Sequence, residues 1–124
     1  MKKKPKILII EDEKILAEMY YDVFVQSGFK VFSATEAKQG LEMAKKEKPD
    51  LIILDILLPR ENGISFLEWQ KKDPEVASIP VVVFTNYDEL DTEKKAKKLG
   101  VKGYLIKANF TPQQFVLKIK NYLE

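Results

Sequence analysis

The chain has 124 residues, of which 45% are hydrophobic and 32% charged, and its formal net charge is +2. This length and composition are typical of one globular domain, and so small a net charge gives no reason to predict a nucleic-acid or membrane partner. Cysteine and histidine are absent, which excludes disulfides, thiol catalysis, zinc-thiolate sites, imidazole metal ligands and a Ser-His-Asp triad within this chain.

Short apolar runs, rich in Ile and Val, recur along the chain. None approaches the ~18 residues of a membrane span, and no signal peptide is visible. Apolar and polar residues hardly alternate in the first, third and fourth runs, which is typical of strands buried on both faces. We therefore predict five strands, at Lys6–Ile10, Lys30–Ala34, Asp50–Leu54, Pro80–Phe84 and Gly103–Ile106.

A helical pattern follows each of the first three strands. The first predicted helix ends at Gly28, and its apolar residues recur at the spacing of one helix face. Thr35 can cap a second helix, which Pro49 stops. A third begins near Gly63 and ends before Pro74. The apolar stripe of the first helix would comprise Ile15, Leu16, Met19, Tyr20, Val23 and Phe24.

The last two helices differ in the strength of their patterns. The fourth is the weakest, with Leu90, Ala96 and Leu99 as its only apolar anchors. The fifth opens with Thr111–Gln114, which supplies a cap, a proline at the first helical position and a capping-box glutamine. Five strands alternating with five helices predict an α/β fold with a doubly wound parallel sheet.

Polar side chains follow four of the predicted strands. Glu11 and Asp12 follow the first strand, Asp55 follows the third, Thr85 follows the fourth, and Lys107 follows the fifth. The carboxyl ends of parallel strands meet at one sheet edge, so we expect these side chains to converge. Taken singly, the acidic pair is often a helix cap, Thr85 a strand-end hydroxyl and Lys107 a surface lysine. Asp55 differs, because a carboxylate within an apolar run is costly to bury without compensation.

Three clustered carboxylates repel one another and favour a hard divalent cation. Without histidine or cysteine, Mg²⁺ is the natural candidate, and with Lys107 it balances the charges of Glu11, Asp12 and Asp55. Such a pocket can accept a phosphoryl group on an aspartate, with Thr85 donating to the phosphoryl oxygens. Without metal, we expect a raised carboxyl pKa, so that Asp12→Ala or Asp55→Asn stabilises the fold.

From Lys6 to Leu123, the chain resembles the receiver domain of two-component response regulators, including the single-domain chemotaxis regulator. The resemblance implies a flavodoxin-like sheet of strand order 2-1-3-4-5. It also implies one receiver domain over residues 1–124, in which 1–5 form a flexible basic tail. The segments that carry it are LIIEDE (Leu8–Glu13), LDILLPRENG (Leu54–Gly63), VVFT (Val82–Thr85) and GYLIK (Gly103–Lys107).

The resemblance also implies a metal site. Asp12 would bind Mg²⁺ directly, with Glu11 as its helper. Asp55 would be both a metal ligand and the phosphoacceptor, and the backbone carbonyl of Leu57 would complete the metal shell.

The implied function is a phosphorylation-controlled switch. A phosphohistidine on a histidine kinase or histidine phosphotransfer protein would donate its phosphoryl group to Asp55, and Lys107 would bind that group. Thr85 would move inward and Tyr104 would follow. The surface of the fourth helix, fifth strand and fifth helix would then change its affinity for a downstream protein.

The resemblance further implies a cytoplasmic signalling domain that catalyses only its own phosphorylation and dephosphorylation. It would contact neither nucleic acid nor membrane. It would be a monomer, or a dimer through the surface of the fourth helix, fifth strand and fifth helix. Nothing after Leu123 resembles a linker, so we expect the natural chain to be complete.

Three positions depart from the commonest family pattern. Glu11 replaces the more usual Asp, Asn86 stands where a small residue usually follows the switch threonine, and Ala108 replaces a proline. Asn86 either covers the pocket mouth, so that Asn86→Ala quickens phosphorylation by small donors, or points to solvent. The Lys107–Ala108 bond can be trans, but we favour the cis form typical of the family, despite a cost of roughly 3–4 kcal/mol. Ala108→Pro would then stabilise the protein.

Two other functions fit parts of the pattern. A Mg²⁺-dependent phosphatase with an aspartyl nucleophile would need Asp-x-Asp after a strand, and no such motif follows the first or third strand. It would also need a cap domain to hold its substrate. A binding module that no longer uses phosphorylation is disfavoured by the presence of Asp55, Thr85 and Lys107 together.

Overall fold

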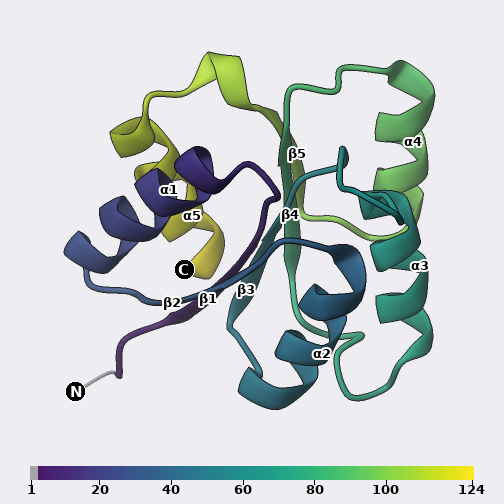
Figure 1. Ribbon diagram of the computed structural model, residues 1–124, viewed down its shortest axis with the longest axis horizontal. Helices are drawn as coiled ribbons and strands as arrows, with labels where there is room; N and C mark the ends of the chain where they lie inside the picture. Colours follow the sequence, from purple (N-terminus) through teal and green to yellow (C-terminus); the bar gives the residue numbers. More distant parts are fainter. Residues whose placement is uncertain (1–2) are drawn as a thin grey trace.

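Five parallel strands form the centre of the computed structural model, which describes residues 3–124 (Figure 1). Their order, β2-β1-β3-β4-β5, confirms the predicted flavodoxin-like sheet. Two residues of the predicted basic tail, Met1 and Lys2, lie outside the described residues. Pro5 adjoins the sheet, because its carbonyl accepts a hydrogen bond from the Lys30 N–H. The strands are β1 (Lys6–Ile10), β2 (Lys30–Ala34), β3 (Leu51–Leu54), β4 (Val81–Thr85) and β5 (Gly103–Ile106).

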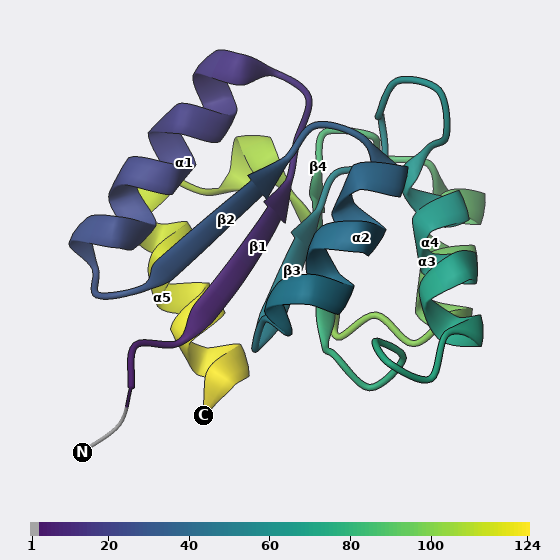
Figure 2. The ribbon, with the colours of Figure 1, turned by 60° about the horizontal axis from the view of Figure 1, so that its bottom comes forward.

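Helices cover both faces of the sheet (Figures 1 and 2). One face carries α1 (Lys14–Gln26) and α5 (Pro112–Leu123). The other carries α2 (Ala37–Glu47), α3 (Gly63–Lys72) and α4 (Leu90–Lys98). A 3₁₀ turn, η1 (Lys107–Asn109), joins β5 to α5. Among residues 3–124, none of the helices has the length and apolar character that a membrane span requires.

The sheet has an apolar core on each face. Leu8 and Ile10 of β1 pack on the side of α2, α3 and α4, whereas Ile7 and Ile9 pack on the side of α1 and α5. All four residues of β3 are buried, as its uninterrupted apolar run predicted. Burial on both faces explains why these strands show so little alternation.

The register brings the ends of the strands together. Ile10 pairs with both Ala34 and Leu54 at the ends of β2 and β3, and Thr85 pairs with Ile106 across β4 and β5. The next residue of β3, Asp55, donates its N–H to the Ile10 carbonyl over 3.1 Å. Residues that follow β1, β3, β4 and β5 therefore lie along one edge.

Helix starts were predicted less well than strands. Ile15 and Leu90, two supposed apolar anchors, are 82% and 63% exposed. Thr35 does not cap α2: the N-cap is Glu36, and the N–H and hydroxyl of Thr35 both donate to the side chain of Gln39. The predicted capping box at the start of α5 is confirmed.

Gly63 offers a test of how closely α3 packs against the segment that carries Asp55. A Cβ at position 63 would lie 2.6 Å from the Asp55 carbonyl oxygen and 2.9 Å from the Ile56 Cα. These are backbone atoms that cannot rotate away, so we expect Gly63→Ala to lower the free energy of unfolding by about 1–3 kcal/mol. Chemical denaturation measures this loss.

Gly103→Ala is the matched control. Its Cβ would meet the hydroxyl end of the Tyr122 side chain, which can rotate, so a smaller loss is expected. Equal losses in the two variants would contradict this account of Gly63.

Candidate functional site

One buried ammonium joins the ends of three strands. The Lys107 Nζ lies 2.5 Å from Glu11 Oε1 and 2.8 Å from Asp55 Oδ2. These three side chains are 9%, 4% and 7% exposed, so the ion pairs form almost without solvent. The partners of Lys107 are 96 and 52 positions away in sequence, and the parallel topology predicted that they would meet.

Asp12 completes a group of three carboxylates with Glu11 and Asp55. One oxygen from each lies within 4.8 Å of the others. Asp12 is exposed while its two partners are buried, so the group opens to solvent on the Asp12 side. Carboxylate oxygens at this spacing suit a hard divalent cation, and the three residues could hold a metal ion. Leu57 donates its N–H to Asp55 Oδ1 over 3.3 Å, and its carbonyl stays a predicted ligand.

The pKa values reflect this burial. Burial raises the pKa of Glu11 above its usual range, although hydrogen bonds from Lys107 and the Glu13 N–H act to lower it. The nearby charge of Asp55 raises this pKa further, but it is the smallest contribution. A raised carboxyl pKa was predicted, but desolvation rather than repulsion is its main cause. For Lys107, burial alone would lower the pKa, but its hydrogen bonds to Asp55 and Glu11 outweigh that effect and raise it.

Two predicted switch residues are joined through a third residue. Thr85 is fully buried at the end of β4, and its Oγ1 accepts a hydrogen bond from the Tyr87 N–H over 3.1 Å. Tyr104 is half-buried on β5, and its hydroxyl donates to the Tyr87 carbonyl over 2.6 Å. Tyr87 was not predicted, because it takes part through backbone groups that every residue has.

The bond between Lys107 and Ala108 is not cis, since residues 3–124 contain no cis peptide, and our expectation was wrong. Ile106 is extended, and the chain then enters the helical turn η1 at Lys107. This turn brings Lys107 to the site with an ordinary backbone. A proline at 108 would disfavour the helical conformation of Lys107, so stabilisation by Ala108→Pro is no longer expected.

Asn86 is exposed, in line with the second alternative, and it also makes a contact that neither alternative described. The side chain is exposed, but its Oδ1 accepts a hydrogen bond from the Ala108 N–H over 3.0 Å. Proline has no N–H and could not make this bond. Asn86 and Ala108 therefore contact each other, and both depart from the family pattern.

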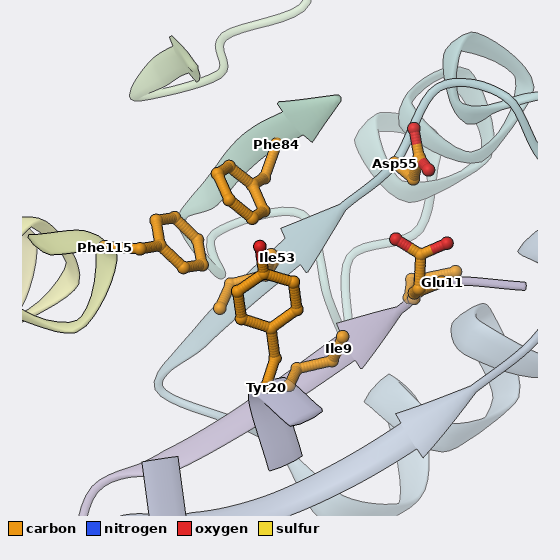
Figure 3. A pocket seen from close by; sticks show the side chains of 8 residues that line it. Ile9, Glu11, Tyr20, Ile53, Asp55, Phe84 and Phe115 are labelled. Carbon is orange, nitrogen blue, oxygen red and sulfur yellow. The ribbon is translucent and has the colours of Figure 1, made fainter. Parts of the chain in front are cut away.

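A small cavity lies beneath the carboxylates (Figure 3). Glu11 and Asp55 border it at one end, and three aromatic rings border it at the other. Phe84 and Phe115 stack at 3.6 Å, with Tyr20 edge-on to both. Its volume of about 10 Å³ is the space of about one water, far too small for an organic substrate. The group of carboxylates is therefore accessible from its exposed side, near Asp12.

Comparisons with known proteins agree on one family. The sequence model described as response regulator receiver domain matches residues 7–120. The polar-differentiation response regulator DivK of Brucella anthropi is 30% identical over 117 residues, which cover 94% of each chain. A CheY-like receiver domain protein from Methanospirillum hungatei JF-1 superposes with a TM-score of 0.89, at 26% identity, over 98% of this chain and 94% of that one. The Mn²⁺-bound form of response regulator Rcp1 superposes with a TM-score of 0.82, at 27% identity, over 97% of this chain and 95% of that one.

The burial of Tyr104 can be tested through pH. Burial, followed by the charges of Glu93 and Asp88, raises the pKa of Tyr104 from 10.0 to about 12. The folded state thus favours the protonated phenol. This contribution to stability is complete below pH 10 and is lost as the pH rises from 10 to about 12. We expect Tyr104→Phe to remove that part of the alkaline loss, measured as the denaturation midpoint against pH.

The exposed Tyr21 supplies a control for this measurement. Tyr21→Phe should retain the alkaline loss of the parent. If Tyr104→Phe lost as much stability as the parent between pH 10 and about 12, the raised pKa of Tyr104 would be contradicted.

Proposed function

Because the chain belongs to the response regulator receiver domain family of two-component systems, we propose that Asp55 accepts a phosphoryl group from a partner's phosphohistidine. The observation that carries this proposal is the Lys107 ammonium, held 2.8 Å from Asp55 beside a group of three carboxylates. Receiver domains are signalling domains rather than conventional enzymes. The chemistry proposed for this chain is limited to its own phosphorylation and dephosphorylation.

The proposed step is a direct transfer between two proteins, from a histidine kinase or histidine phosphotransfer protein. A carboxylate oxygen of Asp55 attacks the phosphorus, the bond from phosphorus to the histidine nitrogen breaks, and its electron pair leaves with the imidazole. The product is an acyl phosphate on Asp55. Lys107 already lies at hydrogen-bond distance and can offset the charge that the group brings.

Thr85 has a suitable hydroxyl for binding the transferred group. The hydrogen bond from Tyr87 uses the Thr85 oxygen as acceptor, so its hydroxyl hydrogen can donate to a phosphoryl oxygen. Any displacement of Thr85 toward that group acts on Tyr87, to which the Tyr104 hydroxyl is bonded. This connection supports Thr85 and Tyr104 as the switch pair. Their movement would alter the surface formed by α4, β5 and α5, where a downstream protein would bind.

Mg²⁺ is the proposed cofactor. Glu11, Asp12 and Asp55 would hold it, with the Leu57 carbonyl as a further ligand, and it would supply charge stabilisation for the incoming phosphoryl group. The donor set supports a hard cation, because it consists of oxygen atoms only. The Rcp1 structure, a Mn²⁺-bound form at 27% identity, supports a divalent ion in the same fold.

Exposed apolar side chains beside the site favour a protein donor. Ile15, three residues after Asp12, is 82% exposed, and Leu57, two residues after Asp55, is 55% exposed. Both residues are close in sequence to the carboxylates of the site, and we propose that they contact the protein that donates the phosphoryl group. We place this exchange in the cytoplasm, with the chain acting as a monomer or as a dimer through α4, β5 and α5.

The phosphoacceptor can be tested with a small donor. We expect acetyl phosphate with Mg²⁺ to add one phosphoryl group to the parent, and none to Asp55→Asn, as measured by intact mass. Chelation with EDTA should abolish the addition. Asp50→Asn is the matched control, because the Asp50 carboxylate accepts from the Lys6 N–H at the opposite end of the strands. No addition to the parent would favour the binding-module alternative, and addition to Asp55→Asn would place the acceptor elsewhere.

The metal site can be tested through stability. Asp12 adds a third negative charge beside Glu11 and Asp55, so Asp12→Ala should raise the free energy of unfolding in EDTA by about 1 kcal/mol. Mg²⁺ should raise the denaturation midpoint of the parent and have much less effect on Asp12→Ala. Asp55→Asn is a less clean test, since it also weakens the bond to Lys107.

Asp22→Ala serves as the control, since Asp22 is an exposed acidic residue of α1. It should respond to Mg²⁺ as the parent does. An equal response in Asp12→Ala would remove Asp12 from the metal site.

A further inference from the structure

A single side-chain hydrogen bond ties the turn that carries Lys107 to the loop after β4. Asn86 Oδ1 accepts from the Ala108 N–H over 3.0 Å, between residues 22 positions apart. We infer that Asn86 is a positioning residue, which holds η1 in the turn that directs Lys107 at Asp55. The effect of this contact on phosphoryl transfer rests on the proposed function, whereas the contact itself does not.

The turn needs such a contact because it is short. Only three residues form η1, and the Phe110 N–H closes it on the Lys107 carbonyl over 3.2 Å. A single 3₁₀ turn has little stability of its own. Lys107 also has a long side chain whose rotamers must be fixed before its ammonium can meet Asp55. Anchoring the adjacent N–H at Ala108 restricts the backbone from which that side chain starts.

The anchor also joins two parts of the proposed site. Thr85, Asn86 and Tyr87 are consecutive, and each makes a hydrogen bond that holds the loop after β4 in place. The loop with the phosphoryl-binding hydroxyl and the turn with the phosphoryl-binding ammonium are therefore one connected unit. Small errors in the placement of either group reduce transfer, because the reaction depends on alignment.

Positioning by Asn86 and gating by Asn86 predict opposite results. If the side chain covered the pocket mouth, Asn86→Ala would quicken phosphorylation by a small donor. If it holds η1, the same substitution frees the turn and slows phosphorylation. The sign of the change therefore separates the two roles.

The first experiment measures the rate of phosphorylation by phosphoramidate at saturating Mg²⁺. We expect Asn86→Ala to be slower than the parent by about five-fold, the usual worth of one hydrogen bond. Asn109→Ala, which removes an exposed amide from the same turn, is the matched control and should remain near the parental rate. A rate for Asn86→Ala equal to or above that of the parent would overturn the inference.

The second experiment asks whether Asn86 acts through Lys107. In a Lys107→Ala background the side chain to be positioned is absent, so adding Asn86→Ala should cause no further loss of rate. A gate or a general loss of structure would still change the rate. If Asn86→Ala lowered the rate of phosphorylation in the Lys107→Ala background by the same factor as in the parent, the inference would be overturned.

The third experiment does not depend on phosphorylation. Hydrogen exchange of the Ala108 amide, followed by NMR, should be faster in Asn86→Ala than in the parent and in Asn109→Ala. Equal exchange in all three proteins would overturn the inference. If the parent fails to accept phosphate, the proposed function fails, and the exchange measurement still decides whether Asn86 holds the turn.

Discussion

The Lys107 ammonium between two buried carboxylates is the contact on which the whole site edge depends. Glu11, Asp55 and Lys107 come from the ends of β1, β3 and β5, and each is costly to bury alone. Removing Lys107 would leave two buried carboxylates without a counter-charge inside the protein. Because two carboxylates face one ammonium, one negative charge remains, and Asp12 adds another at the surface. The fold therefore contains a local excess of negative charge that a cation can satisfy.

The backbone fixes the two buried carboxylates but leaves the third exposed. Glu11 donates its N–H to the Ala34 carbonyl, and Asp55 donates its N–H to the Ile10 carbonyl, so both continue the hydrogen bonding of the sheet. The stacked rings of Phe84 and Phe115 lie below them and leave a cavity of only about 10 Å³. Neither carboxylate can retreat into the core. The group of carboxylates is thereby open toward solvent on the side of Asp12.

Sequence patterns predicted the sheet and the convergence of charged side chains well, and for a physical reason. Strands buried on both faces are largely apolar, so their ends are visible where the first polar or charged residue appears. Ile15 and Leu90 were misassigned because both lie in the first turn of a helix, where helical spacing does not show whether the sheet still covers the side chain. The bond between Asn86 and Ala108 joins two loops, and no periodic pattern predicts a contact between loops.

The Lys107–Ala108 peptide is not cis as expected, and Asn86 and Ala108, the two residues that depart from the family pattern beside it, complement each other. With a proline at 108, the ring shapes the turn, and the residue after Thr85 need not contact it. With Ala108, the turn regains an N–H, and Asn86 supplies the acceptor that a small side chain would lack. Each of the two residues is explained by the other rather than by the site alone. A turn held by a hydrogen bond depends on the loop that provides the acceptor, so in this chain the loop after Thr85 and the turn that carries Lys107 are directly connected.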